Sequence, residues 1–229
     1  MKKTVIAALI IAIGLLALGL SIKAGMDNFS DRDRTVSVRG LAERQVEANS
    51  VSWPMSYDIA GNDLPQLYAK LQSNNRIIVD FLTTNGIDSA EIFVNPPSVY
   101  NAEGNVYGGD RARYQYNFTS TITVNTSKVQ LVRRLLNRMP ELLRQGVAVN
   151  NNYTSYTYTD LNSIKPEMIA EATRNAREAA DKFASDSHSK VGKISTASQG
   201  QFSIESVDSS TPYLMNVRVV SYITYFLED

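Results

Sequence analysis

The chain has 229 residues, of which 43% are hydrophobic, so it is long enough to form one large domain or two small ones with a real core. Residues 24–229 hold 20 basic and 23 acidic residues, a net charge of −3 that gives no general attraction for nucleic acid. Because the chain has no cysteine, disulfides, thiolate metal sites and thiol nucleophiles are excluded.

The N-terminal residues indicate export. Lys2 and Lys3 precede Val5–Ile22, a run of 18 residues without a charge. As a helix this run is about 27 Å long, just enough to cross a bilayer, and the two lysines should remain inside. We therefore expect residues 1–24 to be a signal anchor with a transmembrane helix, and residues 25–33 to be a tether. The alternative is a cleaved signal peptide, which has the same positive start but a shorter apolar run.

Alternating apolar residues predict strands in the next part of the chain. Thr35–Gly40 alternates with period two and should stop at its glycine, and a second strand is expected over residues 45–60. Pro54 cannot donate to a ladder, so it should lie on an edge or at a bulge. Further strands are expected over residues 87–100 and 113–124, as a hairpin with a mobile tip.

Three helices are expected from apolar residues at helical spacing. The first begins after the cap Asp63 and ends at Asn85-Gly86, although Asn74 and Asn75 interrupt its apolar stripe. The second covers residues 128–145, with a break or kink at Pro140. The third begins near Asn162 or Ser163. Its expected apolar stripe is rich in alanine, which indicates close packing on a sheet; the stripe consists of Ile164, Met168, Ile169, Ala172, Ala176, Ala179, Ala180 and Phe183.

The remaining strands complete a predicted order of β-β-α-β-β-α-β-α-β-β. One is expected in Asn150–Asp160, and two more over residues 193–207 and 214–227. This order predicts an α+β fold, with helices packed on a largely antiparallel sheet whose strands pair mostly as sequential neighbours. The N-terminal transmembrane helix would precede it.

Three motifs in this order resemble the SIMPL-domain family of bacterial envelope proteins. They are VSVRGLAERQVEA (Val36–Ala48), LTTNGIDSAEI (Leu82–Ile92) and IKPEMIAEATRNAREAADKFASDSHSKVGKI (Ile164–Ile194). The resemblance covers residues 34–229, which we take as one SIMPL domain. Two positions depart from the family pattern: Asn49-Ser50 replaces a common Pro-Asp, and His188-Ser189 replaces a glycine or small apolar residue before KVG.

The resemblance implies an α+β fold, a periplasmic or envelope location, assembly into homo-oligomers and a link to oxidative-stress defence. It implies no catalytic residues. We therefore expect a single-pass inner-membrane protein with a periplasmic C-terminal domain, or a periplasmic protein if the N-terminal segment is cleaved.

The residues themselves indicate no catalytic, cofactor or metal site. His188 is the only histidine, and a surface or capping role at a helix end accounts for it. No His-x-x-x-His pair or carboxylate cluster at ligand spacing occurs, and GNVYGGDRAR lacks the lysine and the context of a phosphate loop. We expect no enzyme activity and no cofactor.

One predicted helix is strongly basic. Lys128, Arg133, Arg134, Arg138 and Arg144 stand against the single acid Glu141. This segment could face anionic lipid, an acidic envelope polymer or an acidic patch on another subunit. The simpler interpretation is a solvated polar face with an apolar side in the core.

The position of a tyrosine-rich strand is a second open question. In NNNYTSYTYTD, residues 150–160, Tyr156 and Tyr158 share a face with Thr154, while Tyr153, Ser155, Thr157 and Thr159 line the other. The strand is either an inner strand or a subunit edge.

Two functions remain from these observations. The first is a non-enzymatic, membrane-anchored envelope protein that acts by self-assembly and by contacts with envelope components whose identity the residues do not specify. The alternative is a binding module for a small molecule or cell-wall polysaccharide, with aromatic contacts from Tyr100, Tyr107, Tyr114, Tyr116, Tyr153 and Tyr156.

Overall fold

A computed structural model of the chain describes residues 12–23, 34–101, 114–150 and 153–228. The fold divides into two compact units, each built from segments that are distant in sequence. Unit 1 consists of Met1–Arg44, Asn162–Ser203 and Val217–Asp229, and unit 2 of Gln45–Leu161 and Ile204–Asn216.

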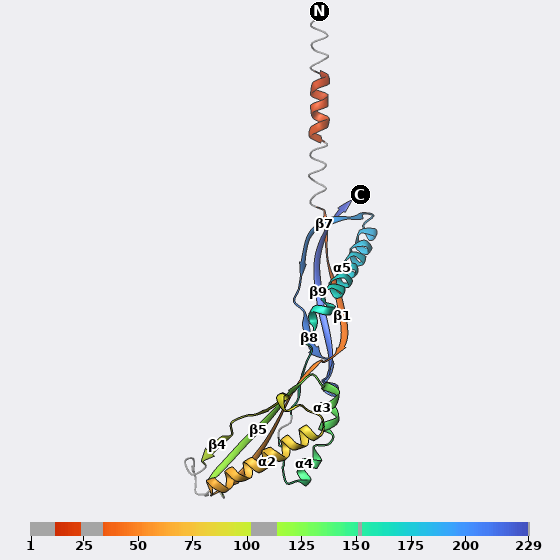
Figure 1. Ribbon diagram of the computed structural model, residues 1–229. Coiled ribbons are helices and arrows are strands. Elements are labelled where there is room, and N and C mark those ends of the chain that lie inside the picture. Colours follow the sequence, from red (N-terminus) through yellow and green to blue (C-terminus); the bar gives the residue numbers. More distant parts are fainter. Residues whose placement is uncertain (1–11, 24–33, 102–113, 151–152, 229) are drawn as a thin grey trace, which may run out of the picture. The chain divides into compact units, whose positions relative to one another are not determined.

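Unit 1 contains a long helix packed on an antiparallel sheet (Figure 1). The sheet has the order β1-β9-β7, with β1 at Thr35–Glu47, β9 at Leu214–Glu228 and β7 at Lys190–Gln199; β8 (Ser203–Ser206) also pairs with β9. Alternate residues of β1 and β9 are buried, as expected for strands with one covered face.

Helix α5, Leu161–Asp186, covers the buried face of this sheet (Figure 1). Its fully buried residues recur every fourth position, at Met168, Ala172, Ala176, Ala180 and Ala184. Because alanine has only a methyl group, the helix axis comes close to the sheet, and Gly40 lies directly against the backbone of α5 at Ala172 and Ala176. The alanine stripe is therefore confirmed.

Unit 2 contains a second sheet, of order β3-β5-β2-β6, with β4 also paired to β5. The strands are β2 (Ser50–Gly61), β3 (Ile92–Val94), β4 (Ser98–Asn101), β5 (Tyr116–Thr126) and β6 (Ser155–Thr157). Helices α2 (Leu64–Thr84), α3 (Val129–Leu136) and α4 (Pro140–Arg144) pack on one face, around a core that includes Trp53, Ile78, Ile122 and Val132. The short 3-10 helix η2 spans Ser89–Glu91.

The expected ends of α2 are confirmed, and its interrupted stripe has a physical reason. Asp63 accepts a hydrogen bond from the backbone N–H of Gln66, and Gly86 has a φ of +96° beyond the C-terminal end. Asn75 accepts hydrogen bonds from the hydroxyl groups of Tyr57 (2.7 Å) and Ser120 (3.1 Å) on the sheet. The asparagine thus satisfies two polar groups beneath the helix.

Pro54 lies on the inner strand β2, in unbroken register with β5, and not on an edge strand or at a bulge as expected, but the ladder needs no donor at this point. It pairs with Thr123 of β5, while β6 pairs only with residues Ser50–Ser52 of β2. Since residues of the same parity as Ser52 direct their backbone N–H groups toward the β6 side, the missing N–H of Pro54 lies past the end of that ladder.

Several predicted boundaries were wrong. Strand β1 does not stop at Gly40 but continues to Glu47, because the glycine serves close packing with α5 rather than a turn. The single strand expected over residues 87–100 is divided into η2, β3 and β4, with Asn95–Pro97 between the strands. The strand expected over residues 193–207 is likewise divided into β7 and β8.

The expected single sheet with sequential pairing was also wrong. There are two sheets, and most pairings, such as β1 with β9 and β2 with β5, join strands distant in sequence. On α5, Phe183 is 61% exposed instead of buried. It lies about 100° around the helix from Ala184, outside the alanine stripe.

At the N-terminus, residues 12–23 are helical. Residues 1–11 and the expected tether, 25–33, lie outside the described residues. Within the described part of the chain, no helix combines the length and the apolarity needed to cross a membrane.

Candidate functional site: an arginine and tyrosine cleft

The candidate site in unit 2 begins with a polar stripe on α3. The apolar residues Val129, Val132 and Leu135 are buried in the core. This orientation leaves Gln130, Arg133, Arg134 and Asn137, spaced i, i+3, i+4 and i+7, on another face of the same turns.

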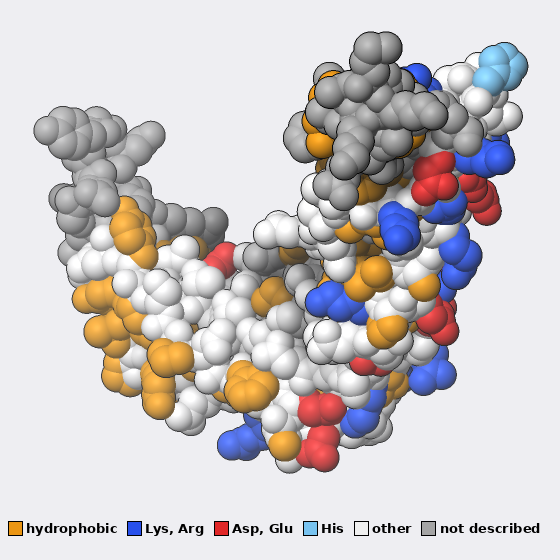
Figure 2. Space-filling view, turned by 90° about the horizontal axis from the view of Figure 1, so that it is seen from above, with side chains coloured by type: hydrophobic (Ala, Val, Ile, Leu, Met, Phe, Trp, Pro, Cys, Tyr) orange, Lys and Arg blue, Asp and Glu red, His pale blue; other side chains and the backbone are white. Residues whose placement is uncertain are grey.

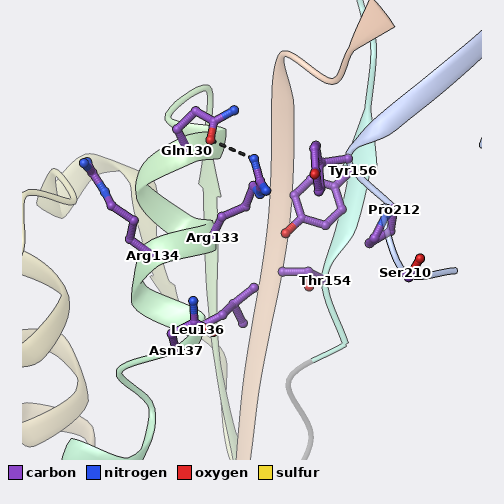
Figure 3. A pocket seen from close by; sticks show the side chains of 10 residues that line it. Gln130, Arg133, Arg134, Leu136, Asn137, Thr154, Tyr156, Ser210 and Pro212 are labelled. Carbon is purple, nitrogen blue, oxygen red and sulfur yellow. Dashed lines mark hydrogen bonds between the residues drawn. The ribbon is translucent and has the colours of Figure 1, made fainter. Parts of the chain in front are cut away.

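An open cleft of about 450 Å³ adjoins this stripe. Its other wall is formed by β6 and by the loop before β9. The described residues that line it are Gln130, Arg133, Arg134, Leu136, Asn137, Thr154, Tyr156, Ser210, Pro212 and Tyr213. Figure 3 shows Arg133 extending from α3 toward the wall that carries Tyr156, whereas Arg134 points away from that wall. Arg133 is therefore the central cation of the cleft, and Arg134 lies at its rim.

Aromatic and amide contacts hold Arg133 in place. Its guanidinium carbon lies 3.4 Å from the centre of the Tyr213 ring, and Nη1 donates a hydrogen bond of 2.8 Å to Oε1 of Gln130. Tyr213 in turn meets Tyr156 edge-on, with ring centres 6.3 Å apart, and its carbonyl accepts a hydrogen bond from the N–H of Ala48. A guanidinium stacked in this way keeps donors in its plane for a ligand.

The loop wall is fixed by Asp208. Its carboxylate accepts hydrogen bonds from the backbone N–H groups of Ser210 and Thr211 and from both hydroxyls. The hydroxyl bonds from Ser210 and Thr211 are the main reason that the pKa of Asp208 falls from its ordinary 3.8 to about 2. At neutral pH the Asp208 carboxylate is ionised and accepts its hydrogen bonds from residues of its own loop.

The lining suits binding of an anion. Among the described residues it contains two arginines, two amides and two aliphatic hydroxyls, but no Asp, Glu, His or Lys. Neither Arg133 nor Arg134 makes an ion pair with another described residue. The site can therefore offer positive charge and hydrogen bonds to a ligand.

The other cations of the basic segment have different roles. Lys128 pairs with Glu91 at 3.0 Å, and Arg138 pairs with Glu141 at 2.7 Å and also contacts Asn85. The basic helix expected over residues 128–145 is two helices, α3 and α4, as the predicted break at Pro140 requires. Because Lys128 and Arg138 are already in ion pairs, fewer of the positive charges in this segment are free to bind a ligand than the sequence indicates.

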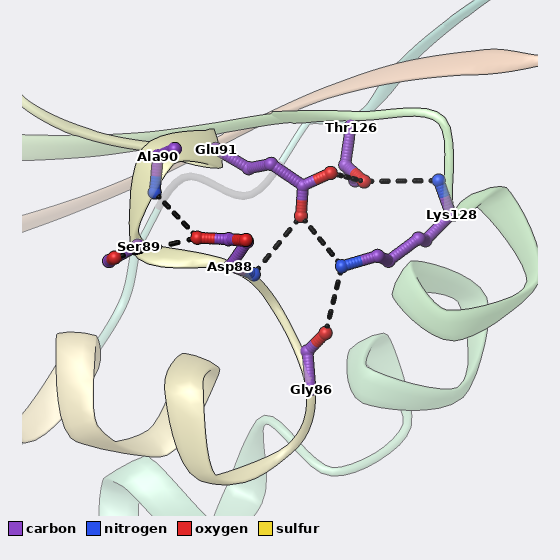
Figure 4. A network of polar contacts seen from close by, with 7 residues as sticks. All are labelled: Gly86, Asp88, Ser89, Ala90, Glu91, Thr126 and Lys128. Atoms are coloured by element: carbon purple, nitrogen blue, oxygen red, sulfur yellow. Dashed lines mark hydrogen bonds and ion pairs between the residues drawn. The ribbon is translucent and has the colours of Figure 1, made fainter.

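Glu91 is the centre of a polar cluster (Figure 4). It accepts hydrogen bonds from the hydroxyl of Thr126, the ammonium of Lys128 and the backbone N–H of Asp88. Lys128 also donates to the carbonyl of Gly86. Partial burial by itself would raise the pKa of Glu91, but the bonds from Thr126 and Lys128 outweigh it and hold the pKa below its ordinary value. The cluster joins the ends of α2, η2 and β5 to the start of α3.

The tyrosines singled out in the sequence do not form one site. Tyr156 is buried and lines the cleft, whereas Tyr153 is 79% exposed and Tyr100 lies on β4. Tyr116 packs against the small cluster of Leu67, Leu71 and Phe118. Tyr107 lies outside the described residues. The predicted alternation of faces at Tyr153 and Tyr156 is confirmed, and β6 is an edge strand of its sheet.

His188 lies just past the C-terminal end of α5. Its φ is +58°, and its N–H donates to the carbonyl of Ser185. This is the left-handed position that often ends a helix and usually favours glycine. Within the described residues, no group of three or more His, Cys, Asp or Glu side chains is placed to hold a metal ion.

Sequence reasoning placed a turn around residues 208–212 but missed the part that this turn and Tyr213 play in the site. The string DSST at 208–211 has the composition of a turn in which an aspartate bonds to its own following backbone. Nothing local marks Tyr213, because its partners Tyr156 and Arg133 are distant in sequence.

The fold and the site together define an α+β protein with two antiparallel sheets and a cleft that carries two arginines. Comparison with known families then places the chain: residues 36–221 match the family described as SIMPL, protein of unknown function (DUF541). The chain therefore belongs to the SIMPL family, and the resemblance seen in the sequence is confirmed. A comparison with curated protein sequences gave no match.

Proposed function

We propose that this SIMPL protein is a non-enzymatic, membrane-anchored envelope protein that acts through self-assembly and through contacts with other envelope components. The observation that carries the proposal is an apolar patch at one edge of the unit 2 sheet. The patch consists of Phe93, Val94, Val99 and Tyr100, each about half exposed.

The patch lies on β3 and β4, which pair one after the other along the same edge of β5. Phe93 is opposite Thr123 and Tyr100 is opposite Asn117, so these two rings lie on the face away from the helices, whereas Val94 and Val99, opposite Ile122 and Phe118, lie at the same edge on the other face. Grouped apolar side chains on a surface typically mark an interaction site. A second copy of the chain is the partner we propose for this patch.

The opposite edge of the same sheet differs in chemistry. Strand β6 pairs only with β2, and its exposed residues are Ser155 and Thr157. Both edges are short, three residues in β3 and three in β6, which limits pairing through backbone hydrogen bonds. Assembly should therefore depend on the side chains of the apolar patch.

Membrane anchoring is supported by the uncharged run Val5–Ile22 after two lysines. In the described helix, residues 12–23, all large apolar side chains are more than half exposed. Such a surface is stable in lipid and unfavourable in water. The proposed location is the inner membrane, with units 1 and 2 in the periplasm. The family resemblance extends the proposal to oxidative-stress defence.

The experiment compares variants of the full chain in a mild detergent by light scattering. Phe93→Lys should lower the assembled mass, because it places a charge in the patch, while circular dichroism remains unchanged. Thr157→Lys is the matched control, because it adds the same charge at the other edge of the sheet. Equal masses for the wild type and Phe93→Lys would overturn the patch as the assembly surface.

A binding module for a small molecule or cell-wall polysaccharide is the second candidate. It is favoured by the cleft beside Arg133, which Tyr156, one of the tyrosines that first suggested this function, helps to line.

A further inference from the structure

We propose that the cleft of unit 2 binds a small acidic sugar, meaning a hydroxylated ring that carries a carboxylate or phosphate group. The anionic group would pair with Arg133, and the ring hydroxyls would meet Asn137, Thr154 and Ser210. This inference goes beyond self-assembly, since the cleft lies toward β6 and the apolar patch lies at the β3 edge of the sheet.

The positive charge of the cleft indicates that its ligand is an anion. Arg133 is half-buried, and within the described residues its polar contact is the neutral amide of Gln130 rather than a carboxylate. Arg134 adds a second positive charge at the rim. The carboxylate of Asp208 accepts its hydrogen bonds from Ser210 and Thr211, and that of Glu47 accepts one from Gln130, so neither is paired directly with Arg133 within the described residues. A half-buried guanidinium without a paired carboxylate favours an oxyanion.

The contacts of Arg133 hold its side chain in place before a ligand binds. The ring of Tyr213 supports one face of the guanidinium, and Gln130 holds one of its nitrogens. Tyr213 is itself fixed by Tyr156 and by the bond between its carbonyl and Ala48. Because these contacts restrict the side chain before a ligand arrives, little conformational entropy is lost on binding.

The remaining lining indicates hydroxyl groups on the ligand. The amide of Gln130 is already bonded to Arg133 and Glu47. The amide of Asn137 and the hydroxyl of Thr154 can both donate and accept hydrogen bonds, and the hydroxyl of Ser210, which donates to Asp208, can accept one. Sugar hydroxyls require such partners, whereas a bare inorganic anion would leave most of them unused. The volume of about 450 Å³ lies within the range of small-molecule sites and accommodates one or two sugar rings.

The test is titration calorimetry on the full chain in detergent. Glucuronate and N-acetylmuramate are the carboxylate probes, glucose 1-phosphate is the phosphate probe, and glucose and inorganic phosphate are the controls. We expect at least one acidic sugar to bind, and to bind more tightly than either control. The comparison of carboxylate with phosphate probes identifies the anionic group.

Matched variants locate the site. Arg133→Gln should weaken binding by about tenfold or more, since it removes a charge-assisted hydrogen bond. Arg144→Gln removes the same charge from an exposed position on α4, outside the cleft, and should leave the affinity unchanged. Tyr213→Leu should also weaken binding, whereas Tyr213→Phe retains the stacked ring and should bind like the wild type.

Three results would overturn the proposal. The first is that none of the acidic sugars binds. The second is that glucose or inorganic phosphate binds as tightly as the acidic sugars. The third is that Arg133→Gln binds with the affinity of the wild type. The light-scattering mass of each variant is measured in parallel, so that loss of ligand binding is distinguished from loss of assembly.

Discussion

Single residues decide how closely the layers of this protein approach. Gly40 is the clearest case, because a Cβ atom there would overlap the carbonyl of Ala172 and crowd the N–H of Ala176, both backbone groups of α5. Backbone atoms of a helix cannot move aside as a side chain can. The position therefore requires glycine for close packing.

We expect Gly40→Ala to lower the free energy of unfolding by about 1–3 kcal/mol, the usual cost of overpacking. Gly192→Ala is the matched control in the same unit, because the three atoms nearest its added methyl group all belong to the flexible side chain of Glu228, which can rotate away. Urea unfolding followed by circular dichroism measures both. Equal stabilities for the two variants would contradict the close approach of α5.

The Asp208 loop gives a prediction at the same scale. The carboxyl pKa is about 2 in the folded chain, below its ordinary 3.8, because the charged form accepts the bonds from Ser210 and Thr211. A lowered pKa means that the carboxylate stabilises the fold above about pH 3.8, and that this contribution is lost as the pH falls through about 2. An NMR titration of the Asp208 carboxyl carbon should have its midpoint near 2, and a midpoint near 3.8 would refute these bonds.

At the scale of elements, the Glu91 cluster joins four segments that the sequence alone does not bring together. We expect Glu91→Ala to cost about 1–2 kcal/mol of unfolding free energy, since it leaves the hydroxyl of Thr126 and the N–H of Asp88 without this acceptor. Lys128→Ala should cost less than about 1 kcal/mol, because the lysine side chain is 43% exposed. Thermal or urea unfolding of both variants tests the order, and a larger loss for Lys128→Ala would contradict it.

The elements also show what the sequence can predict. Local signals were sufficient for α2, where Asp63 and Gly86 mark the ends, and for the break at Pro140. These signals gave a wrong strand end at Gly40, because the sequence does not distinguish a glycine required for close packing from a glycine required for a turn. They also failed for strand pairing, since β1 with β9 and β2 with β5 depend on contacts between distant segments.

The candidate site was predictable only in part. The arginines of α3 were recognised as a basic segment, and Tyr156 as a residue on one face of its strand. Their convergence with Tyr213 was not predictable, because residues 133, 156 and 213 meet only through tertiary packing. The ion pairs that occupy Lys128 and Arg138 were hidden for the same reason.

At the scale of the whole molecule, the fold has two units, each with one sheet and with helices on its buried face. The exposed surface of α5 and the apolar patch of unit 2 differ in the kinds of side chain they present. Figure 2 shows blue and red side chains mixed along α5, with the only histidine of the chain, in pale blue, near its end. Such a mixed surface is typical of a solvated helix face. The apolar patch on β3 and β4 is the more specific candidate for contact with a second copy.

The proposed membrane anchor gives a prediction at this scale. The full chain, produced in bacteria, should remain in the membrane pellet after alkaline carbonate extraction, because an anchor formed by residues 5–22 would be solvated by lipid. A variant with Leu15→Arg and Leu18→Arg should be released, since charges in the apolar run are costly there. An intact mass that lacks the N-terminal segment in the wild type would contradict an uncleaved anchor and favour a signal peptide.

Self-assembly is the central claim, and the molar mass of the full chain tests it most directly. Light scattering in a mild detergent at physiological salt, with the detergent contribution subtracted, reports protein mass over a series of concentrations. We expect a mass that is a multiple of the 25.4 kDa protomer and that persists on dilution. A mass of 25.4 kDa at every concentration, including the highest, would contradict the proposed function.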